Sequence, residues 1–250
     1  MCRRPPLDPT PRRIRESLET QGADVPAAFA KVNRMCFSAT ASFGAAALLL
    51  GVGAVTWKSA HRARERPFSA IPLLFAIQQL VEGVIWLSFR HEAPLLNAVM
   101  TQIYTFFSHV LWPIYVPVAV LLIEPPGWRR KALLALVAAG AAVGASLLYV
   151  MFAFPVVSRP TGQHIEYVSP HFFAALGMTL YLLSTTISLM LSTHRAVQRF
   201  GLPVLLSFAA AYWLYTTWFI SVWCFFAAVL SVLVLGYFLP KPALASEAGP

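Results

Sequence analysis

Long apolar runs, separated by short loops that carry most of the charge, dominate the sequence from Phe37 to Leu239. A run needs about 20 residues to cross the roughly 30 Å of bilayer hydrocarbon as a helix. Five runs reach this length and a sixth is long enough for two helices: 37–57, 68–89, about 95–123, 132–154, 172–192 and 202–239. The sequence therefore predicts an all-α, polytopic membrane protein with seven transmembrane helices, the last two joined by a tight turn near Thr217–Ser221.

Composition supports this class and excludes others. Only 12% of the residues are charged and 58% are hydrophobic, whereas a soluble domain carries about 25% charged residues. The formal net charge is +9, but no soluble segment combines a basic surface with base-stacking aromatic side chains, so we expect no nucleic-acid partner. Three scattered cysteines, Cys2, Cys36 and Cys224, are too few for a disulfide framework. The expected partner is the lipid bilayer, and the sequence indicates no soluble one.

The loops differ in basic charge, which predicts an orientation. Ten basic residues fall on one side of the predicted bundle: Lys58, Arg62, Arg64, Arg66, Arg129, Arg130, Lys131, Arg195, Arg199 and Lys241. The other side carries only Arg90 and Arg159. Because short cytoplasmic loops are enriched in Lys and Arg, we expect the larger set to be cytoplasmic. The body is then N-out and C-in, with 241–250 as a short cytoplasmic tail.

The first 34 residues do not fit this orientation. They hold seven of the 19 Lys and Arg residues and would lie outside. They are rich in proline and lack the apolar core of a signal peptide. Met35 stands just before the first apolar run. We therefore expect 1–34 to be a disordered tail or an extension ahead of a true start at Met35, and 35–240 to be the membrane domain.

Glu82 is the only formally charged side chain inside the apolar runs. A charge at this depth costs about 2.5 kcal/mol or more and is by default a functional-site hypothesis. Gln79 shares its helical face and Gln78 lies beside it. His109 falls at a similar depth on the next, antiparallel run, so we expect it to contact Glu82 directly or through a metal or water. Tyr212 and Tyr215 lie near the outer end of a later run, which completes a predicted polar pocket open to the outside.

Three interpretations of this pocket stay open. Glu and His are both zinc ligands, and a catalytic zinc needs three ligands and a water. Glu82 and His109 would supply two, and His171, Cys36 or Cys224 a third, which would make a metal-dependent intramembrane hydrolase. Alternatively, the pocket belongs to a protein that binds or senses a proton or a small ligand and is not an enzyme. In the third interpretation, a buried Glu–His pair only holds helices together. The sequence does not identify catalytic residues.

Several stretches resemble a family of bacterial multi-pass membrane proteins of unknown function. The segment MCFSATASF at 35–43 resembles the opening of these proteins. Further stretches with this resemblance are IPLLFAIQQLVEGVIWL (71–87), FSHVLWPIYVP (107–117), YVSPHF (167–172) and AAYWLYTTWFISVWCFFAA (210–228). The resemblance implies a multi-pass protein of the bacterial inner (plasma) membrane that starts at Met35, and it implies no activity.

Overall fold

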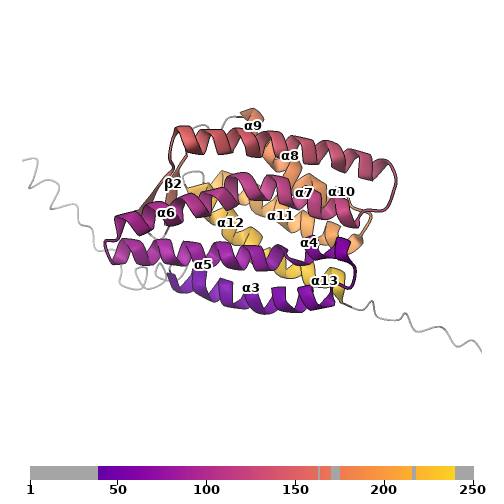
Figure 1. Ribbon diagram of the computed structural model, residues 1–250, viewed down its shortest axis with the longest axis horizontal. Coiled ribbons are helices and arrows are strands. Elements are labelled where there is room, and N and C mark those ends of the chain that lie inside the picture. Colours follow the sequence, from indigo (N-terminus) through magenta and orange to yellow (C-terminus); the bar gives the residue numbers. More distant parts are fainter. Residues whose placement is uncertain (1–38, 163, 170–174, 216–217, 240–250) are drawn as a thin grey trace, which may run out of the picture. The chain divides into compact units, whose positions relative to one another are not determined.

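The computed structural model describes residues 39–162, 164–169, 175–215 and 218–239, and these are mostly helical (Figure 1). The first helices are α3 (Ala39–Ser59), η1 (Ala63–Glu65), α4 (Arg66–Ser69), α5 (Ile71–Arg90), α6 (Pro94–Thr105), η2 (Phe106–Leu111), α7 (Trp112–Ile123) and α8 (Trp128–Ala153). A hairpin of β1 (Val157–Thr161) and β2 (His164–Val168) follows. The later helices are α9 (Ala175–Leu182), η3 (Leu183–Ile187), α10 (Ser188–Leu191), α11 (Arg195–Leu214), α12 (Phe219–Leu230), η5 (Ser231–Val234) and α13 (Leu235–Phe238).

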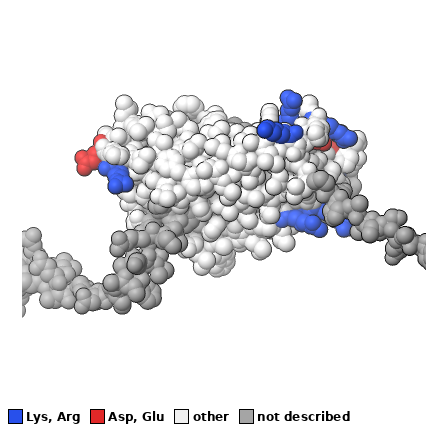
Figure 2. Space-filling model, turned by 90° about the horizontal axis from the view of Figure 1, so that it is seen from below, with Lys and Arg blue, Asp and Glu red and all other residues white. Residues whose placement is uncertain are grey.

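Six helical segments of the described chain are long and apolar enough to cross a membrane: 39–59, 63–90, 94–123, 128–153, 195–214 and 219–238. Many of their apolar side chains face outward, among them Leu95 and Phe152, each 79% exposed. On the face seen in Figure 2, charged side chains gather at the two ends and the surface between them is uncharged. These features identify a multi-pass membrane protein, because a soluble protein rarely exposes so large an apolar surface.

The predicted runs correspond closely to the observed helices. The runs at 37–57, 95–123 and 132–154 become α3, the continuous helix Pro94–Ile123 and α8, each shifted by a few residues. The run at 202–239 divides as expected, although α11 ends at Leu214 and α12 begins at Phe219, so the break comes slightly before the predicted turn. The predicted fifth span is represented by Ala175–Leu191, which is shorter than the six other segments.

Small residues allow the central helices to pack closely. Gly140 of α8 lies against the backbone carbonyl of Pro113 in α7, where a Cβ atom on Gly140 would come within 1.8 Å of that oxygen. Pro117 has no N–H to bond to the Pro113 carbonyl, which would be its usual partner one turn earlier in the helix. Gly144 lies against Ile114 one turn further along. The Gly140-xxx-Gly144 pair thus serves close helix packing.

The β-hairpin was not predicted, because residues 155–170 have the prolines of an ordinary loop. The two strands are antiparallel, with Val157 opposite Val168 and Thr161 opposite His164. Gly162 has a φ of 61° at the start of the two-residue connection, where glycine is favoured because it adopts positive φ without strain. Ile165 and Tyr167 alternate toward the interior and are buried. The hairpin therefore packs as part of the protein core rather than projecting as a free loop.

Candidate functional site

Glu82 lies at a point where four helices contribute polar side chains. It is 1% exposed and projects from α5. Ser221 of α12 donates a 2.6 Å hydrogen bond from its hydroxyl to Glu82 Oε1. The side chains of Gln79, Tyr104 and Ser42 also approach the Glu82 carboxyl group. The local sequence explains this arrangement, since Gln79 and Glu82 are three residues apart and share the buried face of α5.

We define the Glu82 cluster as Gln78, Gln79, Glu82, Tyr104, Tyr167 and Ser221. Several of its buried polar atoms form no hydrogen bond to any described residue: Gln78 Nε2, Gln79 Nε2 and Oε1, Glu82 Oε2, and the hydroxyls of Tyr104 and Tyr167. Buried side-chain polar atoms in proteins are nearly always bonded, and each one left unbonded costs about 1–3 kcal/mol. Gln79 and Tyr104 nevertheless approach Glu82, and Cys224 approaches Gln78 and Tyr104, so these groups lie close together without closing regular hydrogen bonds to one another.

One contact fixes the orientation of an amide in the cluster. The indole Nε1 of Trp112 lies 2.7 Å from Gln78 Oε1. Because an indole nitrogen only donates, the Gln78 atom that receives it must be the oxygen. The Gln78 NH₂ group is then directed elsewhere as a donor. The ring of Trp112 is itself held by a stack on Phe75, with centroids 3.8 Å apart.

The hairpin contributes an aromatic side chain to the Glu82 cluster. Tyr167 of β2 stacks on Tyr104 of α6 with centroids 4.5 Å apart and rings nearly parallel, at 5°. Both rings are buried. Burial, with a smaller contribution from the nearby Glu82 carboxyl group, raises the pKa of Tyr167 well above its ordinary value. Tyr167 therefore stays a neutral hydroxyl, able both to donate and to accept a hydrogen bond.

His109 lies in a second polar group, joined to the hairpin. Its Nδ1 is 2.8 Å from the Ser108 hydroxyl and its Nε2 is 2.9 Å from the Ser169 hydroxyl. His109 is not among the side chains that interact with Glu82, which differs from the direct contact that we expected. The reason lies in η2, a π-helical turn that contains His109, because the wider turn changes which residues share a helical face. Indirect coupling of the two residues through water or metal stays a prediction.

The π-helical turn also explains a contact of Tyr181. Trp112 donates its backbone N–H to Phe107 O, five residues earlier. The next donor in that pattern would be residue 113, but it is proline and has no N–H. The carbonyl of Ser108 is thus left without a helical partner, and Tyr181 donates its hydroxyl to it. A second π-helical turn, η3, follows Tyr181 directly. Such turns are frequent at functional sites.

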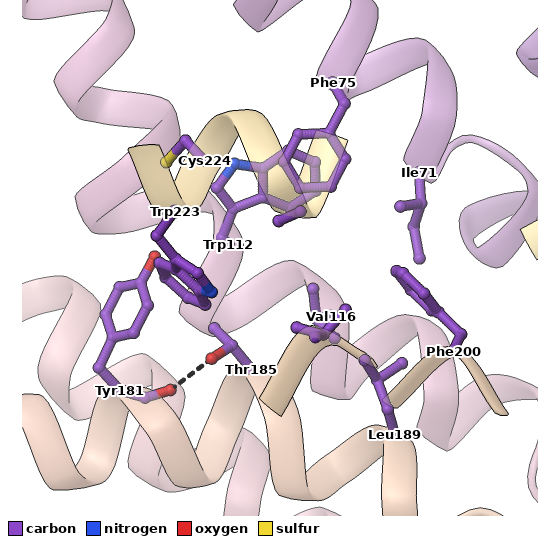
Figure 3. Close-up of a pocket in the computed structure, with 12 residues that line it drawn as sticks. Ile71, Phe75, Trp112, Val116, Tyr181, Thr185, Leu189, Phe200, Trp223 and Cys224 are labelled. Atoms are coloured by element: carbon purple, nitrogen blue, oxygen red, sulfur yellow. Dashed lines mark hydrogen bonds between the residues drawn. The ribbon is translucent and has the colours of Figure 1, made fainter. Parts of the chain in front are cut away.

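A small cavity adjoins the Glu82 cluster. Its volume is about 30 Å³, which is close to the space that one water molecule occupies in the liquid. Most of its lining is apolar, and Figure 3 shows Phe75, Trp112, Trp223 and Tyr181 around it. Cys224 lies on its wall and also interacts with Gln78, Glu82 and Tyr104. Cys224 and Trp112 therefore border both the cavity and the cluster.

The hairpin covers these polar groups from the end of the bundle at which α6 begins. The hydroxyls of Thr101 and Ser158 are 2.7 Å apart, and Gln102 donates a 2.8 Å hydrogen bond to Val156 O. With the stack of Tyr167 on Tyr104 and the contact of Ser169 with His109, these bonds enclose the Glu82 cluster. The open, outward-facing pocket predicted from the sequence stays a prediction.

Residues 35–248 match the model of DUF6629, a family of unknown function. The chain belongs to this family. No curated protein and no solved structure matches the chain. Membership in DUF6629 therefore confirms the resemblance to an uncharacterised family and assigns no activity to the Glu82 cluster.

The structure places other predicted site residues differently. Gln78 and Gln79 do lie in the Glu82 cluster, but Tyr212 and Tyr215 are not among the side chains that interact with Glu82. Tyr212 is 44% exposed and lies against Phe208 and Phe219. Tyr215 contacts the ring of His164 in the hairpin.

The residues that the structure describes include only some of the predicted zinc ligands. His171 and Cys36, two candidates for the third ligand, fall outside the described residues. Among the residues that are described, no three His, Cys, Asp or Glu side chains come together as a metal site. The metal site formed by Glu82, His109 and His171 stays a prediction.

Sequence reasoning missed a second buried carboxylate, Glu124. It directly follows α7, between two apolar runs, and is 2% exposed. Its oxygens accept hydrogen bonds from the Ser192 hydroxyl at 2.9 Å and from the Thr193 backbone N–H at 3.0 and 3.1 Å. Arg130 donates to the backbone carbonyl of Glu124 at 3.0 Å. Glu124 thus joins two loops and is fully bonded, which indicates a structural role.

Proposed function

We propose that this chain is a seven-span protein of the bacterial inner membrane, N-out and C-in, that binds a proton or one small polar ligand at the Glu82 cluster. The observation that carries the proposal is the set of buried donors and acceptors around Glu82 that approach one another without closing regular hydrogen bonds. A cluster that only held helices together would be expected to bond its own polar groups. A guest that both donates and accepts hydrogen bonds would complete this one.

The course of residues 175–191 supports a seventh crossing. The segment follows the hairpin, which packs on α6 and α12, and Figure 1 shows α9 and α10 following one another along the bundle. At its other end, Leu191 and Ser192 accept hydrogen bonds from Arg129, which lies in the first turn of α8, at the end away from the hairpin. Its 17 residues cover about 25 Å as a helix.

The donors and acceptors of the Glu82 cluster, and the space beside it, limit which ligands it can bind. The two Gln amides and the two Tyr hydroxyls offer donors, and Glu82 Oε2 and Gln79 Oε1 offer acceptors. The adjoining cavity of about 30 Å³ admits a water-sized molecule but no large substrate. A proton carried by Glu82, with ordered water, fits this space directly. A larger polar ligand would require the hairpin to move.

Infrared difference spectroscopy on the purified protein in lipid nanodiscs tests the proposal. We expect a pH step to change the C=O band of a protonated carboxyl group, and the change to disappear in Glu82→Gln. Glu124→Gln and Glu166→Gln are matched controls, one buried and one in the hairpin, and should keep the band. If no carboxyl band depends on Glu82, native mass spectrometry of the same sample should show a bound small molecule that Glu82→Gln loses. Failure of both results would overturn the proposal.

A further inference from the structure

A large polar cavity opens at the end of the bundle opposite the hairpin. Its volume is about 870 Å³, within the range of small-molecule sites. Its lining comes from the C-terminal end of α3, the following turn, the N-terminal turn of α11, and α13: Ser59, His61, Glu65, Thr193, His194, Arg195, Ala196, Arg199, Gly236, Tyr237, Phe238 and Leu239. None of these residues belongs to the Glu82 cluster, so this cavity is a separate site.

The arginines at this end of the molecule differ in whether their guanidinium groups form hydrogen bonds within the protein. Arg129 donates to the carbonyls of Leu191 and Ser192, and Arg130 donates to those of Leu121 and Glu124. These two guanidinium groups hold loops together. The guanidinium groups of Arg195 and Arg199, in contrast, have no hydrogen bond and no ion pair to any residue that the structure describes, and both residues line the cavity.

The positions of Arg195 and Arg199 suit an anion. They are four residues apart on α11 and therefore project from the same side of the helix. They lie in the first turns of a 20-residue helix whose N-cap residue, His194, makes no side-chain hydrogen bond to that turn. A helix N-terminus attracts anions through its free N–H groups and its dipole. Two guanidinium groups at such an end form a typical receptor for a phosphate group.

The other charges near the cavity are of both signs. Arg62 and Arg64 lie close enough to Tyr237, on the cavity wall, to interact with it electrostatically, and Glu65 and Glu124 also interact electrostatically with Tyr237. Glu65 is the only acidic residue among the described lining residues, and its carboxylate accepts a 3.2 Å hydrogen bond from the Arg62 backbone N–H. The opposite wall is apolar, with Phe238 and Leu239. The cavity thus combines a basic side with an apolar side at the end of a membrane-embedded bundle.

We propose that this cavity binds a phosphate-bearing anion, with Arg195 and Arg199 as its main ligands. The chemistry is that of an anionic phosphodiester, as in a lipid headgroup, or of free phosphate. Basic pockets between transmembrane helices are known to accept lipid headgroups. The apolar wall of α13 would accommodate the glycerol and upper acyl chains of a lipid, which free phosphate does not need.

Native mass spectrometry of the full chain in detergent tests the proposal. The protein is titrated with phosphatidylglycerol, with phosphatidylcholine, and with inorganic phosphate at constant ionic strength. We expect saturable binding of phosphatidylglycerol and much weaker binding of phosphatidylcholine. The double variant Arg195→Gln/Arg199→Gln should weaken phosphatidylglycerol binding by about 30-fold, from the usual contribution of a basic residue at an anionic lipid surface. Competition by inorganic phosphate would identify free phosphate as the source, and its failure would identify the lipid.

A matched control removes the same charge from the same end. Lys58 and Lys131 are exposed and do not line the cavity, so Lys58→Gln/Lys131→Gln should leave the affinity nearly unchanged. Equal weakening by the two double variants, or equal binding of both lipids, would overturn the proposal. If the glutamine variant does not fold, Arg195→Lys/Arg199→Lys keeps the charge but loses the two-pronged guanidinium geometry. It should still bind more weakly than the parent, and unchanged binding would equally contradict the assignment.

Discussion

Glu82 and Glu124 are both buried carboxylates, and their surroundings assign them different roles. Glu124 uses both oxygens, which accept a hydroxyl and a backbone N–H. Glu82 uses only Oε1 for a hydrogen bond, while Oε2 has no such partner in the described chain. Because an unbonded buried group is costly, evolution would be expected to remove Glu82 if it served packing alone. Glu82 is therefore the better functional candidate, as its position inside an apolar run predicted.

The hydrogen bond between Glu82 and Ser221 can be tested by a double-mutant cycle. Glu82→Gln replaces the carboxyl acceptor by a neutral amide and Ser221→Ala removes the donor, so their effects on the free energy of unfolding should not add. We expect an interaction energy of about 0.5–3 kcal/mol, as is typical for coupled neighbours. The measurement is denaturant unfolding in detergent micelles.

Ser169→Ala is the control for this cycle. Ser169 bonds to His109 and not to Glu82, so the pair Glu82→Gln/Ser169→Ala should be additive to within about 0.5 kcal/mol. Strong coupling in the control pair would show that the Glu82 and His109 groups act as one site, joined by water or a metal.

The surroundings of His164 predict that the stability of the folded protein depends on pH. Its ring stacks on Trp218 with centroids 4.6 Å apart, and burial lowers its pKa below the ordinary value of 6.5. A lowered pKa in the folded state means that the unfolded chain binds the proton more readily. Stability is therefore complete above about pH 6.5 and is lost as the pH falls below it.

We expect the melting temperature of the parent protein to fall between pH 7 and pH 5 more steeply than that of His164→Gln. His91→Gln, which changes an exposed histidine at the same end of α5 and α6, should follow the parent curve. Parallel curves for the parent and His164→Gln would show that the hairpin histidine does not contribute to this pH dependence.

At the scale of elements, apolar runs predicted the helices well and the finer features poorly. The length and continuity of an apolar run locate a spanning helix, because the thickness and the apolar interior of the bilayer require both. They do not reveal a π-helical turn, which depends on prolines such as Pro113 and on neighbours such as Tyr181. The sequence does contain features typical of a hairpin, with Ile165 and Tyr167 in alternation and Gly162 at the turn. The nearby proline, Pro160, argues against a strand, so the pattern indicates a loop. Neither η2 nor the hairpin was visible in the apolar pattern, although His109 lies in the one and bonds to Ser169 just after the other.

The contact between α7 and α8 gives a prediction about an element. Gly140→Ala would place a Cβ atom against the Pro113 carbonyl, so the two helices must separate. We expect the free energy of unfolding to fall by about 1–3 kcal/mol, as in other overpacked cores. Gly51→Ala in α3 is the control, because nothing lies within 4 Å of its Cβ position; it should be neutral or stabilising, since alanine favours a helix. Similar losses for both variants would mean that Gly140 has no special packing role.

At the scale of the whole molecule, charge separates along the bundle as the sequence indicated. Figure 2 shows most Lys and Arg side chains of the visible face at one end. Composition and loop charge predict such an arrangement because both follow from the bilayer. They could not predict that Arg129 and Arg130 bond to loops while Arg195 and Arg199 face a cavity, since that difference arises only when distant helices pack together.

The seven-span orientation is tested by reporter fusions at sites on both sides of each proposed crossing. Fusions after Arg64, Arg130, Arg195 and the C-terminus should report the cytoplasm, and fusions at Glu92 and Gly162 should report the outside, because the short basic loops stay cytoplasmic. The pair Gly162 and Arg195 decides the seventh crossing, since 175–191 is the only apolar helix that the structure describes between them. If both sites report the same side, that segment does not cross and only six spans remain. Neutralising Arg195 and Arg199 together should leave the other reporters unchanged, because each remaining cytoplasmic loop keeps its own basic residues. Opposite signals at Gly162 and Arg195 would place the hairpin, and the Glu82 cluster beneath it, toward the outside of the cell.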